Sequence, residues 1–335
     1  MSVAPKYHHC FEKPEDAKEA IHRLPAIAHY WLKEDGTFII SPVERCAFLH
    51  LNSDDEREQF IEQFWYSRSV EPISLDYDFK TEFYRRIVFA NERYGSKLLV
   101  GRNTDRGRLF VNFGPPDSVD NLAVPHSVET WHYHYIKGIG ENVQFHFEYI
   151  TRYDDYLLPD ADRDLVGEAD PSPDEFPITL ESIDRFRAVD WPPKVRFEDL
   201  QALLFSRTTR DQVKIIHRIK FSPATRATTL ARISIQLPCK KCTCDGQIPP
   251  SSAYPLFIQV KNQSGRVVAT RELVADNVVR DVSNSTFYLD VPVYIPLAPG
   301  PYELAIAAKN RSTGEAGVVR TNIEVPTYDS LETKN

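Results

Sequence analysis

This chain of 335 residues contains no long apolar run and no cluster of basic residues. Its apolar runs stop short of the roughly 18 to 20 residues that a helix needs to cross a bilayer, and its first residues lack the apolar core of a signal peptide. The formal net charge is −8. Nucleic acids and anionic membranes both require clustered Lys and Arg that replace counterions. We therefore expect neither nucleic-acid binding nor a membrane span.

Most sequence signatures of enzymes are missing as well. The chain has no Gly-x-Ser-x-Gly elbow, no His-Glu-x-x-His pair, no phosphate loop and no dinucleotide fingerprint. Gly138 and Gly140 are interpreted as turn residues, because no helix follows them to present its amino end to a phosphate. We expect no cofactor.

Cysteine is scarce, and its count is odd. Five cysteines mean that at least one stays free or pairs between chains. Cys239, Cys242 and Cys244 lie within six residues, a spacing open to three interpretations: a metal knuckle, a redox pair, or a strand-end disulfide or plain thiols. No fourth metal ligand follows them. A structural role is therefore favoured over a bound metal.

Length and composition indicate two folded units. A chain of this size, with 42% hydrophobic and 26% charged residues, can bury two cores. A stretch rich in Asp and Pro near residues 160–177 has the composition of a solvated linker. The predicted division is a helical arm at 1–28, an α+β domain at 29–158, a linker at 159–200, a β-sandwich at 201–327 and a tail at 328–335.

The first third carries helix signals. Pro14 begins a short helix that Pro25 interrupts. Ser53 with Glu56 forms a capping box that opens a second helix. Apolar residues at helical spacing predict a third helix over residues 78–94, which Gly95 ends.

The most distinctive segment follows this third helix. It reads Gly101-Arg102-Asn103-Thr104-Asp105-Arg106-Gly107-Arg108, and residues 109–113 after it alternate in a way that predicts a strand. Asp105 could bind an anion with the flanking arginines, or it could fix a turn through its own backbone. We expect the Asp105 carboxylate to accept from the amides of residues 106–108, and Arg106 or Arg108 to meet Glu82 or Glu92.

A hairpin is predicted from residues 131–135 and 143–149. Trp131, Tyr133 and Tyr135 should share the buried face with Phe145, Phe147 and Tyr149, so paired residue numbers sum to an even value. The opposite face then holds four polar residues together: His132, His134, His146 and Glu148. Such a face could bind zinc or supply a general base, although a plain solvated face is the more common arrangement.

The last third alternates in short segments that are typical of strands. The segment Pro299-Gly300-Pro301-Tyr302 is similar to the last hairpin of immunoglobulin-like sandwiches, where a tyrosine turns the corner. The predicted fold class is therefore an α+β domain, with helices packed on a small antiparallel sheet, followed by an all-β immunoglobulin-like sandwich.

Several motifs across residues 29–158 together resemble one family. They are Trp31-Leu32, Phe38-Ile39-Ile40, Glu44-Arg45, the run at 55–65, Tyr84-Arg85-Arg86-Ile87, Ala90-Asn91, the 101–108 segment, Glu129-Thr130-Trp131 and Phe145-His146-Phe147. In order and spacing they resemble the GWxTD domain, found in bacterial proteins that carry it behind an export signal and have no assigned activity. Arg102 stands where that family has its eponymous tryptophan.

The resemblance and the missing enzyme motifs favour a non-catalytic binding or assembly module that acts through protein–protein contacts. The alternative is a hydrolase-like or metal-dependent enzyme that uses Asp105 with the His132, His134 and His146 face. If the family's export habit applies, the location is extracytoplasmic and the signal lies outside this chain; otherwise it is cytoplasmic. The sequence does not fix the oligomeric state.

Overall fold

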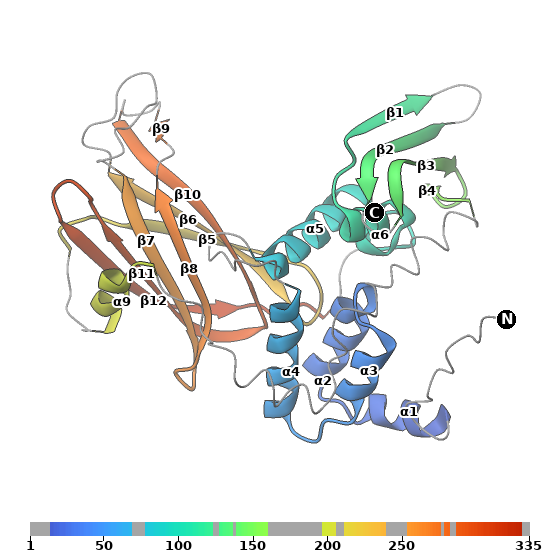
Figure 1. Cartoon of the computed structure of the whole chain (residues 1–335), viewed down its shortest axis with the longest axis horizontal. Helices are drawn as coiled ribbons and strands as arrows, with labels where there is room; N and C mark the ends of the chain where they lie inside the picture. Colours follow the sequence, from blue (N-terminus) through green and yellow to red (C-terminus); the bar gives the residue numbers. More distant parts are fainter. Residues whose placement is uncertain are drawn as a thin grey trace.

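The computed structural model consists of a helical unit, a small sheet and a two-sheet sandwich (Figure 1). It describes residues 14–68, 78–122, 127–136, 139–159, 196–205, 211–238, 253–275, 278–281 and 286–329. Cys239, Cys242, Cys244 and most of the predicted linker lie outside these residues. No helix among them is both long and apolar enough to span a membrane.

The helices of the first third begin where local signals place them. Pro25 separates α1 (Pro14–His22) from α2 (Ala26–Tyr30). A π-helical turn, η1 (Trp31–Asp35), and a 3-10 turn, η2 (Gly36–Phe38), lead to α3 (Pro42–Leu49). Both bonds of the predicted capping box are present at the start of α4 (Asp54–Ser67). The predicted third helix is α5 (Phe79–Tyr94), and Asp78 caps it.

These helices enclose an aromatic core. Trp31 of η1 packs against the rings of Phe48, Phe60 and Phe64 at centroid distances of 5.0 to 6.3 Å. Trp65 contacts Phe83 of α5 at 5.2 Å. Burying such rings contributes about 2 to 3 kcal/mol each.

The predicted strand at residues 109–113 is wrong, because these residues belong to the helix α6 (Asp105–Phe113). The Thr104 side chain caps it by accepting from the Gly107 amide, and Gly114 follows its last residue with φ +84°. Leu109 and Phe110 pack on the small sheet, whereas Val111 joins the helical core. Four of the five residues at 109–113 are apolar, and a run this short does not distinguish a strand from a helix by its period.

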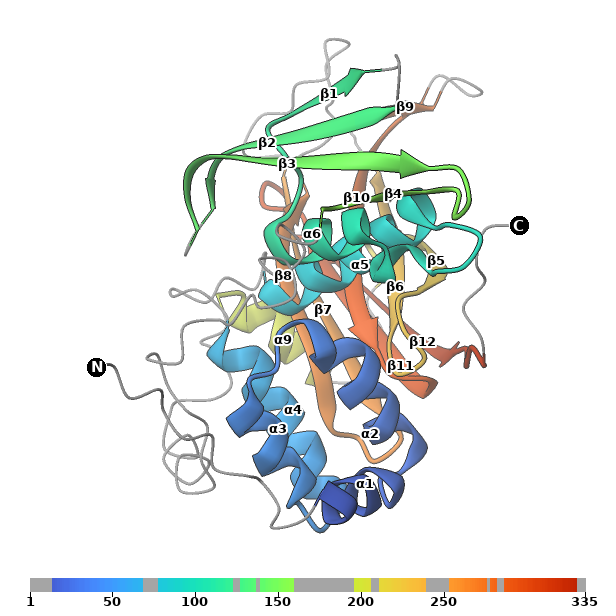
Figure 2. The same cartoon turned by 90° about the vertical axis from the view of Figure 1, so that its right-hand side faces the viewer.

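The small sheet has the strand order β1-β2-β3-β4. Its strands are β1 (Ser118–Leu122), β2 (Val128–Ile136), β3 (Gly140–Ile150) and β4 (Asp155–Leu157). The predicted parity is confirmed, since Trp131 pairs with Phe145 and Tyr133 with Val143. The sheet lies across α5 and α6 (Figure 2). Tyr135 departs from the prediction, because it is 60% exposed and the next residue, Ile136, is buried in the core instead.

The sandwich comprises two antiparallel sheets. One has the order β5-β6-β10-β9, built from β5 (Ile216–Pro223), β6 (Thr229–Pro238), β10 (Thr286–Leu297) and β9 (Val278–Asp281). The other has the order β12-β11-β7-β8, built from β12 (Ala316–Val325), β11 (Gly300–Lys309), β7 (Tyr254–Asn262) and β8 (Val267–Ala275). This confirms the predicted β-sandwich after an α+β unit.

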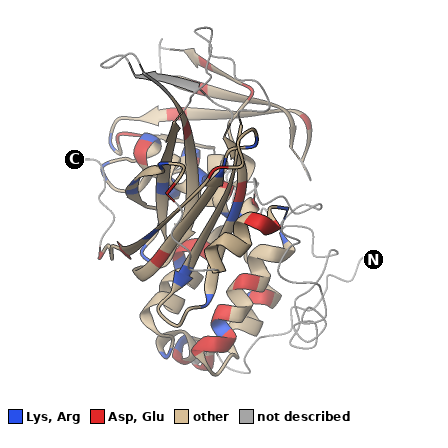
Figure 3. Ribbon diagram, turned by 90° about the vertical axis from the view of Figure 1, so that its left-hand side faces the viewer, with Lys and Arg blue, Asp and Glu red and all other residues tan. Residues whose placement is uncertain are grey.

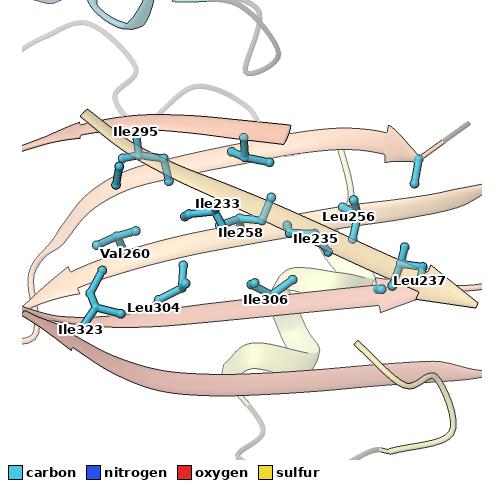
Figure 4. Close-up of a cluster of buried hydrophobic side chains, with 14 of the residues drawn as sticks. Ile233, Ile235, Leu237, Leu256, Ile258, Val260, Ile295, Leu304, Ile306 and Ile323 are labelled. Carbon is cyan, nitrogen blue, oxygen red and sulfur yellow. The ribbon is translucent and has the colours of Figure 1, made fainter. Parts of the chain in front are cut away.

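Aliphatic side chains from both sheets form the sandwich core. Figure 4 shows Ile233 and Ile235 of β6 facing Leu256 and Ile258 of β7. The helix α9 (Glu198–Phe205) covers the outer side of β7 and β11 with Leu200 and Leu204. The first three residues of this helix, 198–200, fall inside the predicted linker.

Candidate functional site

Two glycines of the 101–108 segment allow main chains to touch. A Cβ atom at Gly101 would lie 1.8 Å from the Ala90 carbonyl oxygen of α5, and one at Gly107 would lie 1.8 Å from the Gly101 carbonyl oxygen. The short helix η3 (Gly101–Asn103) therefore packs on α5, and α6 packs on η3, without intervening side chains. Thr104 tightens this corner by donating from Oγ1 to the Gly101 carbonyl at 2.8 Å.

Asp105 and Arg106 connect α6 to the small sheet. An Asp105 oxygen accepts from the Leu158 amide, just beyond β4, at 2.8 Å. Arg106 lies 3.4 Å from a Glu129 oxygen and 3.9 Å from an Asp155 oxygen, and its guanidinium covers the Tyr156 ring at 4.3 Å. Burial raises the pKa of Asp155 above its ordinary value.

These contacts correct the expectations for this segment. The amides of Gly107 and Arg108 donate to the side chain and carbonyl of Thr104, not to Asp105. Arg106 meets Glu129 and Asp155 rather than Glu82 or Glu92, because the segment forms a helix start instead of a strand start. Arg108 is half-buried on α6.

Arg102 is buried where the helical unit meets the sandwich. Its guanidinium donates to Glu34 at 2.9 Å and reaches the Ala224 carbonyl at 3.5 Å. The same Glu34 carboxylate accepts from the Arg226 amide at 3.1 Å and also pairs with the Arg226 guanidinium. Desolvation lowers the pKa of Arg102. One carboxylate of η1 thus joins two arginines that come from different folded units.

A second buried carboxylate lies beside the first. Asp35 is fully buried and accepts from the Tyr84 hydroxyl at 2.5 Å and from the Thr228 hydroxyl at 2.8 Å. Its other oxygen has no hydrogen-bond partner among the described residues. Burial raises the pKa of Asp35 from 3.8 to about 6. The burial penalty on its charged form exceeds what these hydrogen bonds return.

We call these residues the junction cluster: Glu34, Asp35, Tyr84, Asn91, Arg102, Arg226 and Thr228. Its sandwich members come from the turn between β5 and β6, whose Ala224 and Ala227 pack into the helical core. Asn91 of α5 bonds both sides of the junction, accepting from the Arg102 amide at 3.1 Å and donating to the Ala224 carbonyl at 3.0 Å. The cluster therefore holds the two units together.

Further ion pairs lie along the same boundary. Arg266, at the turn between β7 and β8, bonds Glu58 at 3.2 Å and Glu62 at 2.5 Å on α4, a helix whose acidic residues are coloured in Figure 3. Arg271 of β8 pairs with Asp78 and donates to the Thr81 hydroxyl at 2.8 Å. Together with the junction cluster, these contacts extend the boundary from α4 to η3.

Sequence reasoning did not assign a site role to Glu34, Asp35, Tyr84, Asn91 or Arg226. Tyr84 and Asn91 were among the motif residues that resemble the family, which was the available signal. Arg226 carried no local signal, since its partner lies 192 residues away in the sequence.

The polar face of the hairpin is separate from the 101–108 segment. His132 bonds an Asp120 oxygen at 2.9 Å, His146 bonds the Thr130 hydroxyl at 3.0 Å, and His134 is exposed, as is Glu148. The other face of the sheet packs on α6. Asp105, at the start of α6, therefore lies on the opposite side of the sheet from these histidines. In the described part of the chain, no three His, Cys, Asp or Glu side chains gather to hold a metal.

A protein-family model matches the first part of the chain. The GWxTD domain model matches residues 28–159, which span η1, the junction-cluster residues of the helical unit and the small sheet. No curated protein matches the chain.

Proposed function

This chain belongs to the GWxTD-domain family, and we propose that it is a non-catalytic binding or assembly module that acts through protein–protein contacts. The proposal rests on the contacts that the 101–108 segment makes within the protein. Arg102, Asp105 and Arg106 each bond another part of the protein, and the two glycines serve close packing. The segment holds the helical unit to the small sheet through Asp105 and Arg106 and to the sandwich through Arg102. We infer that it serves assembly of the fold and does not present groups to a substrate.

The geometry does not favour the hydrolase alternative. General acid–base catalysis requires the carboxylate and the imidazole within hydrogen-bond reach of the same reacting atoms. Asp105 and the His132, His134 and His146 face lie on opposite sides of the small sheet. His132 bonds Asp120 instead, on the outer surface of the sheet.

The contact surface that we propose is the free edge of β1. This strand is at the end of the small sheet, and all five of its residues are exposed. Val119 and Leu122 are 42% and 63% exposed. Asp120 is the only charged residue of the strand, and it bonds the neighbouring His132. It is therefore not an isolated charge that would prevent another strand from pairing with this edge. An exposed edge with apolar side chains can receive an extended strand from a protein partner.

We further propose that the sandwich is immunoglobulin-like and that the protein is extracytoplasmic. The Tyr302 hydroxyl donates to the Ala298 carbonyl at 3.0 Å, the bond that a tyrosine makes at the corner of such sandwiches. Cys46 is disulfide-bonded, which suits an oxidising compartment. Thiol alkylation of protein taken directly from its cells, followed by mass spectrometry, tests this location: a blocked Cys46 supports it and a freely alkylated Cys46 contradicts it.

Isolation of the protein from its own cells under native conditions tests the binding proposal. Native mass spectrometry should show a stoichiometric complex heavier than the 38.5 kDa chain. The double substitution Val119→Glu with Leu122→Glu should release the free chain, because two buried charges cost far more than an edge contact contributes. Ile216→Glu is the matched control, since Ile216 is 43% exposed on β5, an edge strand of the sandwich.

Two results would contradict this proposal. The first is a free chain in the native preparation together with turnover of an ester or amide that Asp105→Asn abolishes without changing thermal stability. The second is a complex that survives the β1 double substitution but not the Ile216→Glu control, which would move the contact to the sandwich.

A further inference from the structure

A cavity of about 300 Å³ opens between the amino end of α5 and the strands β8 and β10. Figure 1 shows this end of α5 directed at the sandwich. The helix contributes Asp78, Thr81, Glu82 and Arg85, and the strands contribute Arg271, Leu273, Pro292, Val293 and Tyr294. None of these residues belongs to the junction cluster or to the 101–108 segment.

The acidic groups of this cavity are already occupied. The Asp78 oxygens accept from the Thr81 amide and from Arg271. The Glu82 oxygens accept from Arg85 at 3.2 Å and from Arg86 at 3.1 Å. Each of the four carboxylate oxygens therefore has a protein donor, and neither acid presents a free charge to a ligand.

The unused hydrogen-bonding capacity consists of donors. Arg85 uses one nitrogen on Glu82, and its guanidinium lies 4.8 Å from the centre of the Tyr294 ring. Arg232 lies directly across from Tyr294 in the β6–β10 register, 5.9 Å from the same ring. Among the described residues, Arg232 makes no hydrogen bond or ion pair, and the Tyr294 hydroxyl has no partner. Arg85 and Tyr294 line the cavity, and Arg232 lies beside the ring of the same tyrosine.

One wall of the cavity is apolar, opposite the polar residues of α5. Leu273, Pro292 and Val293 line it beside the tyrosine ring, and Val293 is buried in the sandwich. A site with an apolar wall and a few convergent donors suits a small molecule that has an apolar body and one anionic end. Arginine forks match the oxygens of carboxylates and phosphates.

We propose that this cavity binds a small soluble anion, a carboxylate or phosphate carried on an apolar or aromatic body. The anionic end is bound by Arg85, Arg232 and Tyr294, and the body contacts Leu273 and Val293. The site lies in a chain of net charge −8, so the arginines supply a local attraction for an anion. This inference does not depend on the β1 contact surface.

Isothermal titration of the whole chain with phenyl phosphate and benzoate tests the proposal, with benzyl alcohol and inorganic phosphate as probes that each lack one half of the ligand. Phenyl phosphate should bind saturably at millimolar or lower concentration, and each half-probe should bind about tenfold or more weakly. Raising the salt concentration should weaken binding. Equal heats for phenyl phosphate and benzyl alcohol would overturn the anionic recognition.

Substitutions identify the site. Arg232→Gln should weaken phenyl phosphate binding about tenfold, because a charge-assisted hydrogen bond contributes about that factor. Arg232 is exposed and makes no bond in the described structure, so the fold should remain unchanged. Tyr294→Phe should have a smaller effect in the same direction. The matched control is Arg218→Gln, another exposed arginine on the same sheet face, two positions along the strand register.

Three outcomes overturn the proposal. They are the absence of saturable binding to every probe, an equal loss in Arg232→Gln and Arg218→Gln, and binding only to vesicles that contain phosphatidate. The last would assign the arginines to a lipid surface instead of a soluble ligand. None of the three bears on whether β1 binds a protein.

Discussion

Replacing Arg102 with methionine should destabilise the whole molecule by about 3 kcal/mol. Arg102 and Glu34 are both buried, with side-chain exposures of 6% and 8%. Removing one partner of a buried ion pair typically costs about 3 to 5 kcal/mol, because the remaining charge is left uncompensated. Here the lower end applies, since Glu34 keeps Arg226. For a cooperative unit of 150 to 250 residues, this loss corresponds to a fall of roughly 6 to 12 °C in Tm.

A double-mutant cycle separates the pairing from the loss of packing. Glu34→Met should be at least as destabilising as Arg102→Met, because it leaves two arginines without their carboxylate. The double variant should be more stable than the sum of the single losses implies, with a coupling of about 1 to 3 kcal/mol. Guanidinium unfolding, followed by tryptophan fluorescence and by far-UV circular dichroism, measures both quantities. A loss under about 0.5 kcal/mol for Arg102→Met, the range of ordinary surface substitutions, would refute the reasoning.

Three further predictions concern charge, packing and connectivity. Asp35 has a folded pKa of about 6, above its ordinary 3.8. The stability contributed by its protonated side chain should therefore be fully present below about pH 4, and about 3 kcal/mol of unfolding free energy should be lost relative to Asp35→Asn as the pH rises through 6. Urea titrations at pH 4 to 8 measure this loss, and parallel plots of unfolding free energy against pH for the two proteins would contradict it. Gly107→Ala should abolish folding or cost more than about 3 kcal/mol of stability, since its Cβ would overlap the Gly101 carbonyl. The control Gly36→Ala, whose Cβ would have no neighbour closer than 3.6 Å, should change the stability by no more than about 0.5 kcal/mol. Thermal denaturation compares the two variants, and equal stabilities would contradict the close packing at Gly107. Limited proteolysis should cut first within residues 160–195, yet the two fragments should elute together from a sizing column because the junction cluster joins them; separate elution without denaturant would show that the boundary is weak.

Local signals predicted those parts of the fold that depend on neighbouring residues. Ser53 and Glu56 are three residues apart, so their capping box is legible in the sequence. The parity of the hairpin followed from side-chain alternation, because a slip of one residue would expose Trp131. Tyr135 escaped this reasoning, since the alternation breaks at this end of the strand and Ile136 is buried instead.

The error at α6 has a physical origin. Leu109 and Phe110 face the small sheet while Val111 faces the helical core, so apolar residues follow one another at 109–111, and so short an apolar run has no clear period. Thr104 before it and Gly114 after it were the informative residues, since they are an amino-terminal cap and a terminating glycine. Given these end signals, a helix was the better prediction.

The junction cluster could not be predicted from sequence alone. Glu34 and Arg226 come from segments 192 residues apart, and nothing local distinguishes Arg226 from other surface arginines. Buried carboxylates such as Asp35 are recognised only once the elements around them are assembled, because burial is a property of the packed structure. The motif resemblance indicated which segment matters, but not that its role is to join two units.

Amide hydrogen exchange of Glu34→Gln tests whether the Glu34 carboxylate joins the helical unit to the sandwich. The Arg226 amide bonds the Glu34 carboxylate, and the Arg102 guanidinium spans 122 residues to reach the Ala224 carbonyl. We predict faster exchange in residues 101–104 and in residues 224–228 together, with the β2–β3 hairpin unchanged. Weaker hydrogen bonds to residue 34 should loosen both sides of the junction. Faster exchange confined to the helical unit, with residues 224–228 as protected as in the wild type, would contradict it.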